Sequence, residues 1–469
     1  MSRRVFAILL LLISLSINCR LLIPSDQTPP KNLHSPTNPP DIPQKTTGVP
    51  STSTPADTIV PPSPTSTFTE VPTFTHTPTS TPTIRPTPSP IHLQVFEELW
   101  TAVDENYLYQ DFNGLDWDAI QEEYSEIINS GLSDAKFYML MNELVFRLGD
   151  DHSTYFDPAE VPDVDAETNG EYKFVGIGIL GTVVDGKDYL SVILTFPGGP
   201  AEKAGLLAHD NILAVNGEPI VDHGDIRFDL IQGPADSTID IIVQSPSEEP
   251  RTLTMMREEI TGNFPVPHSR LVSPLGKQIV YILLASFRDS NVDENVGEIL
   301  EDLGDNEPID GLIIDNRFNR GGGSDVLINL LSYFMDGDAG YFVQREHDRL
   351  LTIEGRDIHG SQSIPLVILI GPDTASFGEI FSGILKDNNR AHLIGLQSEG
   401  NVEVLHIYDF SDGSRAWIAQ ETFRPFFYPD EEWEKTGIIP HQILSSKWDE
   451  FTFENDPIIQ TALQHLDKN

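Results

Sequence analysis

The sequence predicts an α/β protein with a partly parallel sheet, preceded by a small helical region and a strand-rich region. Three observations favour this fold. Apolar residues recur at helical spacing between residues 91 and 165. Short strand-like runs separated by glycine turns fill residues 170–260. From residue 270 to residue 469, apolar strands alternate with amphipathic helices, which is typical of a sheet with parallel strands.

The composition excludes several classes of function. The 469 residues carry a formal net charge of -43, so the surface repels phosphate backbones and we expect no nucleic-acid partner. Cys19 is the only cysteine, which excludes an internal disulfide and a cysteine zinc site. The chain also lacks a His-Glu-x-x-His motif. We therefore expect neither a metal nor another cofactor.

The first residues have the pattern of an export signal. Two arginines precede an apolar run from Val5 to Ile17, and Cys19 lies at the end of that run. This order predicts a lipoprotein-type signal over residues 1–19, with Cys19 as the lipidated residue. Asn18 and Ser16 depart from the usual residues before such a cysteine, so an ordinary secretory signal or an uncleaved anchor stays open.

Residues 20–90 have the composition of a linker. The stretch "TSTPADTIVPPSPTSTFTEVPTFTHTPTSTPTIRPTPSP" is dominated by proline, threonine and serine and has no apolar periodicity. Such a segment cannot bury a core, and its prolines favour an extended, semi-rigid chain. We expect it to hold the folded regions away from a membrane.

The helical region, residues 91–165, ends in a loop that contains a histidine. One predicted helix has Phe96, Leu99 and Val103 on one face, and a second ends at Gly149. The sequence "LGDDHSTYFDP" then places His152 just past that end. Taken alone, a single loop histidine is most often a solvated surface residue.

The strand-rich region contains a long motif. "FPGGPAEKAGLLAHDNILAVNG" resembles the P-x-x-PA-x-x-AGL-x-x-GD-x-I-x-x-VNG core of PDZ domains, with His209 in place of the usual glycine. The resemblance implies a PDZ domain over residues 170–260 that binds an extended peptide as an added strand. The groove is expected at four consecutive residues, Val175, Gly176, Ile177 and Gly178. A PDZ domain that serves only as a lid or spacer is the alternative.

Two loops of the α/β region follow predicted buried strands. "DNRFNRGGG" comes after "DGLIID", and "GPDTAS" comes after the strand-like run at 365–370. Such loops lie at the carboxyl ends of strands, where α/β proteins bind their ligands. Ser324 is predicted to cap one helix. Ser376 begins another, and its pairing with Glu379 is also typical of a capping box.

Together these motifs resemble the carboxy-terminal processing peptidases, also called tail-specific proteases. "DNRFNRGGG" is similar to their D-L-R-x-N-x-GG loop, and "TASFGEI" to their T-A-S-A-S-E-I segment. "GLDWD", "LGDDHS", the PDZ motif and "GIIPHQIL" occur in the family's order. The resemblance implies a ClpP/crotonase-like core over residues 270–469 with Ser376 as nucleophile. Gly321, Gly322 and Phe377 are the candidate oxyanion donors.

The pattern departs from the family at the base. The Ser/Lys peptidases carry a lysine in G-x-x-T-x-G-K, where this chain reads "GLQSEGN" and has Asn401. Leu405 occupies the position of the family's glutamine. Lys386 lies in the preceding helix, at a position that is not catalytic in the family. An asparagine cannot act as a general base, so another residue must take the proton of Ser376.

The tricorn-like branch of the same fold offers an alternative base. Its members use a histidine from the helical region and a glutamate in E-x-x-G-V-x-P, which "DDHS" and "WEKTGIIP" resemble. This similarity implies His152 as the base and Glu434 as the acid. Asp151 stands where tricorn has a serine. Because Glu431 and Glu432 adjoin Glu434, a solvated acidic cluster is the alternative for that residue.

The predicted function is an exported serine endopeptidase that cleaves unfolded proteins or carboxy-terminal tails by Ser/His/Glu acyl-enzyme chemistry. We expect it at the outer face of a bacterial membrane or in the periplasm, anchored by lipid or secreted. An inactive peptidase-like protein that binds peptides or apolar ligands is the main alternative. Retention of His152 and Glu434 favours the enzyme. The sequence does not predict an oligomeric state or a physiological substrate.

Overall fold

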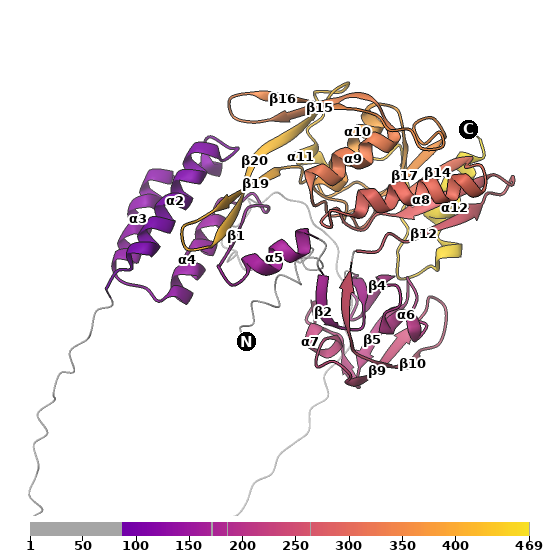
Figure 1. Ribbon diagram of the computed structural model, residues 1–469, viewed down its shortest axis with the longest axis horizontal. Coiled ribbons are helices and arrows are strands. Elements are labelled where there is room, and N and C mark those ends of the chain that lie inside the picture. Colours follow the sequence, from indigo (N-terminus) through magenta and orange to yellow (C-terminus); the bar gives the residue numbers. More distant parts are fainter. Residues whose placement is uncertain (1–86, 170–171, 185, 263, 469) are drawn as a thin grey trace, which may run out of the picture. The chain divides into compact units, whose positions relative to one another are not determined.

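The computed structural model describes residues 87–169, 172–184, 186–262 and 264–468 (Figure 1). The predicted signal, Cys19 and nearly all of the linker lie outside these residues. Within the described ranges, no helix has the length and apolar character needed to cross a membrane.

Helices form most of the first region, as predicted, and α2, α3 and α4 make up its core. Their apolar faces pack together around Phe96, Tyr124 and Phe137. Asp116 caps the second helix by accepting the N–H of Ala119 at 3.1 Å. The elements of this region are α2 (Pro90–Asn106), η1 (Phe112–Gly114), α3 (Trp117–Asn129), α4 (Asp134–Phe146), β1 (Thr154–Phe156) and α5 (Val161–Thr168).

The second region contains a six-stranded antiparallel sheet in which the path β10-β9-β5-β4-β3 ends at β3, an edge strand. A separate strand pair, β2 with β11, lies beside the loop that leads into β3. The strands are β2 (Tyr172–Gly176), β3 (Ile179–Val183), β4 (Leu190–Thr195), β5 (Asn211–Val215), β6 (Glu218–Pro219), β7 (Val221–Asp222), β8 (Asp225–Ile226), β9 (Thr238–Gln244), β10 (Arg251–Met256) and β11 (Glu258–Gly262). Two short helices complete the region, α6 (Pro200–Lys203) and α7 (Phe228–Ile231).

The third region is built on a six-stranded sheet of order β12-β13-β14-β17-β18-β21. All neighbouring strands are parallel except the edge pair of β12 with β13, which confirms the predicted partly parallel sheet. The strands are β12 (His268–Val272), β13 (Gln278–Leu283), β14 (Gly311–Asp315), β17 (Leu366–Ile370), β18 (His392–Gly395) and β21 (Gln442–Ile443).

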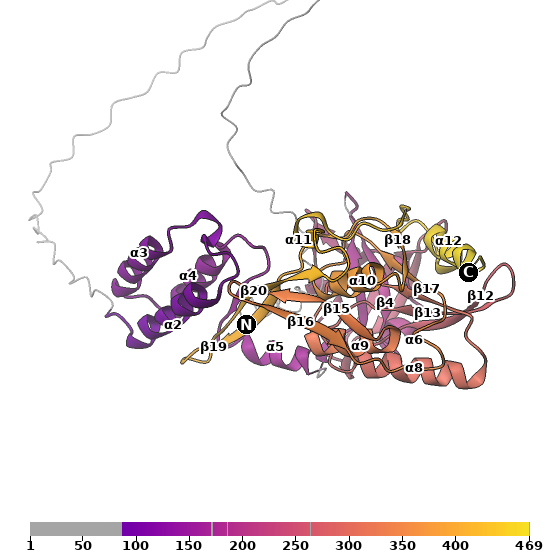
Figure 2. The same ribbon diagram turned by 90° about the horizontal axis from the view of Figure 1, so that it is seen from above.

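Helices cover both faces of this sheet (Figure 2). Side chains of α8 (Val292–Asn306), α9 (Ser324–Phe334) and α10 (Phe377–Asp387) pack on one face, and α12 (Pro457–Leu466) packs on the other. Leu180, Ile193 and Phe196 of the second region join the cluster that includes α12. The predicted cap of α9 is wrong: Gly323 is the N-cap, and Ser324 is the first helical residue.

A second, antiparallel sheet connects the first and third regions. It has the order β1-β20-β15-β16, with β19 also paired to β20. Its strands after β1 are β15 (Gly337–Val343), β16 (Asp348–Ile353), β19 (Val404–Asp409) and β20 (Arg415–Pro425). The short elements α11 (Trp433–Thr436) and η2 (Phe453–Asn455) follow in the chain. Because β1 begins two residues after His152, its pairing with β20 positions that histidine.

Candidate active site

Ser376 lies where β17 gives way to α10. Its backbone has φ 52° and ψ -131°, a conformation that a residue with a side chain rarely adopts. Its hydroxyl makes no capping hydrogen bond, so the capping-box prediction is wrong. Glu379 instead accepts the N–H groups of Gly400 and Asn401, both at 2.8 Å. The serine hydroxyl is thus not engaged in holding the helix start.

The loop after β14 packs directly against this serine. A Cβ atom on Gly321 would lie 2.9 Å from Ser376 Oγ and 2.8 Å from the backbone nitrogen of Phe377. Gly378, in the first turn of α10, is similarly close to the carbonyl of Asn319. That carbonyl accepts the N–H of Ala375 at 2.9 Å. Glycine is required at these positions because any side chain would separate the two loops.

Two backbone N–H groups remain as candidate oxyanion donors. The N–H of Gly321 donates to Asn319 Oδ1 at 2.9 Å, which removes it from the predicted set. Among the contacts of the described residues, the N–H groups of Phe377 and Gly322 have no acceptor. Phe377 is also the first residue of α10, where the helix dipole favours a developing negative charge.

The segment from Ser398 to Glu403 connects the serine to the remaining candidate residues. The carbonyl of Asn401 accepts the N–H of Ser376 at 2.7 Å. The buried Glu379 carboxylate holds this segment through its two N–H bonds and a third bond from the hydroxyl of Ser398. The position that carries the family's lysine therefore supports the serine through its backbone.

Lys386 lies away from the serine. It is ten residues further along α10, which corresponds to about 15 Å of helix. Its Nζ atom is 3.4 Å from a carboxylate oxygen of Glu431. Neither Lys386 nor Asn401 thus places a basic group at Ser376.

His152 faces a buried carboxylate. Its Nδ1 lies 3.5 Å from Glu403 Oε2, and the imidazole side chain is 19% exposed. Asp150 accepts the backbone N–H of His152 at 2.9 Å, and Ser153 accepts the N–H of Ala419 from β20 at 2.9 Å. The loop is therefore fixed on both sides of the imidazole. Among the contacts of the described residues, His152 and Ser376 form no hydrogen bond with each other.

Two glutamates lie behind the histidine. Glu403 is 2% exposed and accepts a hydrogen bond from the Tyr109 hydroxyl at 2.6 Å. Glu434 accepts the N–H of Val402 at 2.6 Å, and the carboxylate of Glu403 is its neighbour. Burial, together with the adjacent Glu403 carboxylate, raises the pKa of Glu434 to about 9. Glu434 therefore keeps its proton at neutral pH.

Sequence reasoning missed Glu403. It stands in the run "NVEVLHIY" and lies just before strand β19. The available signal was an acidic residue between Val402 and Val404, because a carboxylate in a buried run requires a partner.

The four predicted groove residues lie at the start of the second region's edge strand. Val175 and Gly176 belong to β2, and Ile177 and Gly178 form the loop between β2 and β3. Gly178 has φ 73°, a backbone conformation that favours glycine. The structure thus brings these residues to the beginning of β3, the strand to which a peptide could pair.

Comparison with protein families matches each region. Residues 278–444 match the model of peptidase family S41, residues 197–245 match a PDZ domain, and residues 91–146 match the tricorn protease C1 domain. The same order of regions was predicted from the sequence.

Known relatives extend over most of the chain. It is 31% identical over 337 residues to the chloroplastic C-terminal processing peptidase of Tetradesmus obliquus, a match that covers 68% of this chain and 70% of that one. It is 30% identical over 366 residues to the chloroplastic carboxyl-terminal-processing peptidase 2 of Arabidopsis thaliana, covering 75% and 68%. The structure of the photosystem II D1 C-terminal processing protease superposes with a TM-score of 0.54 at 28% identity, covering 76% and 94%. The chain belongs to the carboxyl-terminal processing peptidases, which are serine peptidases.

Proposed function

We propose that this chain is an exported serine endopeptidase that cleaves unfolded proteins or carboxy-terminal tails, with Ser376 as nucleophile and His152 as base. One observation carries the proposal. Ser376 is held in a strained conformation at a helix start, without a capping bond, while Gly321 lies against its hydroxyl. Such strain is stored where a side chain must be presented to a substrate.

The reaction follows from these positions. Ser376 Oγ attacks the carbonyl carbon of the scissile bond while its proton passes to His152. The carbonyl oxygen becomes an oxyanion that accepts hydrogen bonds from the N–H groups of Phe377 and Gly322. His152 then donates the proton to the leaving amine. Water attacks the resulting ester with His152 again as base and releases the acid and free Ser376.

The acid in this set is Glu403, with Glu434 behind it. The Glu403 carboxylate lies on the Nδ1 side of His152, so it favours the tautomer that leaves Nε2 free to accept a proton. It also stabilises the imidazolium that forms during the reaction. Glu434, predicted from the tricorn-like pattern, lies beside Glu403 and holds the backbone N–H of Val402.

His152 and Ser376 must come together during the reaction. They form no hydrogen bond here, and catalytic hydrogen bonds are often long in proteins without substrate and shorten on binding. His152 belongs to a loop anchored by the three residue pairs of β1 with β20. We propose that substrate binding brings this loop to the serine.

Substrate capture and location complete the proposal. The PDZ region is proposed to bind an unstructured peptide along the β3 edge, with the chain terminus at Val175–Gly178. Export and lipid attachment through Cys19 are proposed from the amino-terminal pattern. Detergent phase separation of the wild type and a Cys19→Ala variant tests the anchor. If the wild type and Cys19→Ala both stay in the aqueous phase after export, the lipid anchor is wrong and the protein is simply secreted.

A covalent probe tests the nucleophile directly. A fluorophosphonate reacts with activated serines, so we expect one label, located on Ser376 by peptide mass spectrometry. The same preparation should cleave an unfolded protein, and Ser376→Ala should abolish both signals. An unlabelled, inactive wild type that still binds peptides would favour the alternative function, a peptide-binding protein of the same fold.

A further inference from the structure

The PDZ motif departs from its usual form at one turn, where His209 stands, and the structure shows what this histidine contacts. His209 replaces the usual glycine and keeps a backbone of φ 72°, which favours glycine. Its side chain is nevertheless almost fully buried, with the residue 1% exposed. An imidazole held in this conformation must be stabilised by contacts beyond its own turn.

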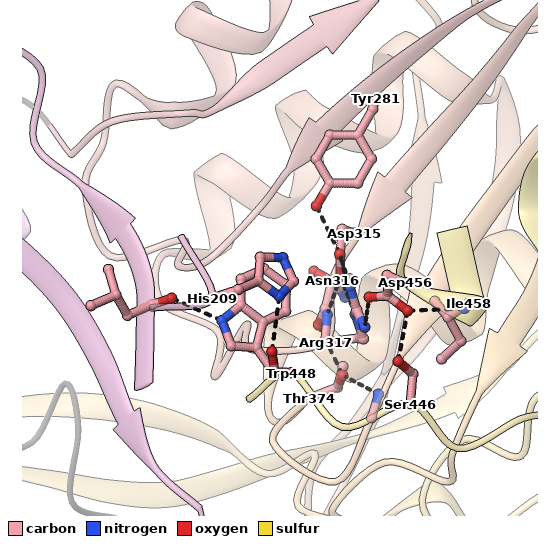
Figure 3. A network of polar contacts seen from close by, with 12 residues as sticks. His209, Tyr281, Asp315, Asn316, Arg317, Thr374, Ser446, Trp448, Asp456 and Ile458 are labelled. Atoms are coloured by element: carbon pink, nitrogen blue, oxygen red, sulfur yellow. Dashed lines mark hydrogen bonds and ion pairs between the residues drawn. The ribbon is translucent and has the colours of Figure 1, made fainter. Parts of the chain in front are cut away.

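Those contacts are made with Trp448, which lies between β21 and α12. The two rings stack with centroids 3.6 Å apart and an angle of 15° between their planes. Nδ1 of His209 is 2.9 Å from the carbonyl oxygen of Trp448, and because a carbonyl only accepts, Nδ1 carries the proton. The indole N–H of Trp448 donates back to the carbonyl of Val192 on β4 at 2.8 Å (Figure 3). The PDZ region therefore holds this tryptophan by its ring, its carbonyl and its N–H.

The same indole contacts the start of the loop that follows β14, residues 316–323. We call this segment the oxyanion loop. The guanidinium carbon of Arg317 lies 5.1 Å from the centre of the Trp448 ring, and Phe318 packs edge-on against it at 4.9 Å. Arg317 is itself buried between two carboxylates, with Asp315 and Asp456 both within hydrogen-bond distance (Figure 3). The guanidinium can therefore move only if these bonds or the indole contact change.

From Arg317, a short chain of contacts leads to the serine. Two residues further on, Asn319 accepts the N–H of Ala375 with its carbonyl and the N–H of Gly321 with its side chain. Gly321 in turn lies against Ser376 Oγ. The oxyanion loop is thus bound at one end to Trp448 and at the other to the nucleophile.

We propose that His209 and Trp448 are positioning residues that set the oxyanion loop through Arg317 and Phe318. This inference rests on the proposed function, because the loop is assigned there as the source of an oxyanion donor. The PDZ region is then part of the active unit through a specific aromatic contact, and the change from glycine to histidine provides that contact. Loss of the stack should free the loop and lower the rate of acylation while substrate binding is preserved.

The sharpest variant is His209→Gly. Glycine adopts φ 72° without strain, so this change removes the ring and leaves the turn intact. We expect faster hydrogen–deuterium exchange in residues 316–323 and a kcat reduced by about ten-fold or more on a short peptide, with KM little changed. A merely structural contact would lower the thermal stability without this division between kcat and KM.

Two matched variants of Trp448 test whether its aromatic ring is what orders the oxyanion loop. Trp448→Phe keeps an aromatic face between His209 and Arg317, whereas Trp448→Leu removes it, so the phenylalanine variant should retain more activity. Tyr189→Phe is the control, because it loses a 2.6 Å hydrogen bond to Asp449 beside the stack but leaves both rings in place. We expect Tyr189→Phe to match the wild type in kcat and in exchange of residues 316–323.

The outcomes separate this inference from the proposed function. Wild-type exchange in residues 316–323 and wild-type kcat in both His209→Gly and Trp448→Leu would overturn the positioning role. A wild type without turnover would contradict the proposed function instead. In that case the exchange measurement, which needs no activity, still decides whether the stack orders the loop. If His209→Gly does not fold, the contrast between Trp448→Phe and Trp448→Leu decides it.

Discussion

The two halves of the candidate site are built in different ways. Ser376 and the oxyanion loop follow β17 and β14, which are neighbouring parallel strands of one sheet. His152 and Glu403 precede β1 and β19, which belong to the second sheet and pair with β20 on either side. One half is thus assembled within a single fold motif, and the other half by strands that are distant in sequence.

This difference determines which half is rigid. The loops beside Ser376 are fixed by close backbone packing at Gly321 and Gly378, where no side chain fits. The His152 loop depends on a strand of three residues, Thr154–Phe156, and on a few hydrogen bonds. Small elements with few buried contacts open more readily than the core of a sheet. In the proposed mechanism, Ser376 and its oxyanion donors therefore form the more rigid half, and His152 belongs to the adjustable half.

The largest expected effect is on turnover, when the proposed catalytic residue of either half is replaced. Ser376→Ala and His152→Ala should each reduce turnover of an unfolded substrate by several orders of magnitude, about 10⁴-fold or more, because the two groups act as a unit. For the same reason the double variant should be little worse than either single variant. Steady-state cleavage rates of the three proteins provide the measurement.

Lys386→Ala and Asn401→Ala are the controls for this experiment. Lys386 points to Glu431, and Asn401 supports Ser376 through its backbone, so both variants should lose far less activity. A fully active His152→Ala that still requires Ser376 would show that the adjustable half does not supply the base.

The second prediction concerns the two glutamates behind His152. Glu403→Gln removes the charge beside Nδ1 and should lower kcat by about 10²- to 10⁴-fold, as for the acid of other serine triads. Glu434→Gln should cost much less at neutral pH, because the raised pKa of Glu434 keeps its carboxyl protonated there and an amide resembles that form. Comparison of kcat for the two variants checks this. Equal reductions in kcat would contradict the assignment of Glu403 as the acid and Glu434 as its support.

A third prediction addresses the PDZ region. Peptides with a free terminal carboxylate should bind more tightly than the same peptides with an amide terminus. PDZ domains hold a chain terminus with backbone donors, and the terminus is proposed to lie just before the edge strand β3. Loss of charge-assisted hydrogen bonds should weaken binding by about ten-fold or more. Isothermal titration of the intact Ser376→Ala protein measures this without cleavage. Identical affinities would exclude capture of the terminus.

The last prediction concerns the stability of the fold as a function of pH. The pKa of Glu434 is raised to about 9 in the folded chain, from an ordinary value of 4.5, so the folded state retains a proton that the unfolded state releases. The stability that this proton contributes is fully present below pH 4.5 and is lost as pH rises towards 9. Urea midpoints of the wild type should therefore fall between pH 6 and 9 more than those of Glu434→Gln. Parallel curves would contradict a protonated Glu434.

The sequence predicted the serine half better than the histidine half for a physical reason. Neighbouring parallel strands bring their carboxyl ends to one edge, so "DNRFNRGGG" and "GPDTAS" could be placed together from the order of strands. No local pattern specifies that the residue before β19 meets the residue before β1, and Glu403 was missed. The capping box at Ser376 also failed, because the sequence does not reveal that this residue adopts φ 52°. His209 was noted only as a departure in a turn, since its partner lies far along the chain.

The contact between Arg317 and Asp456 has a consequence for the order in which the site is completed during synthesis. The oxyanion loop is made well before Asp456, whose carboxylate holds the Arg317 guanidinium at 2.7 Å. Chains emerge from the ribosome amino terminus first, at about 5–20 residues per second, and fold as their parts become available. Until Asp456 has joined the fold, Arg317 lacks one of its two partners and the loop is incompletely braced. In the proposed function, a chain that still lacks Asp456 therefore carries Ser376 beside an incompletely braced loop.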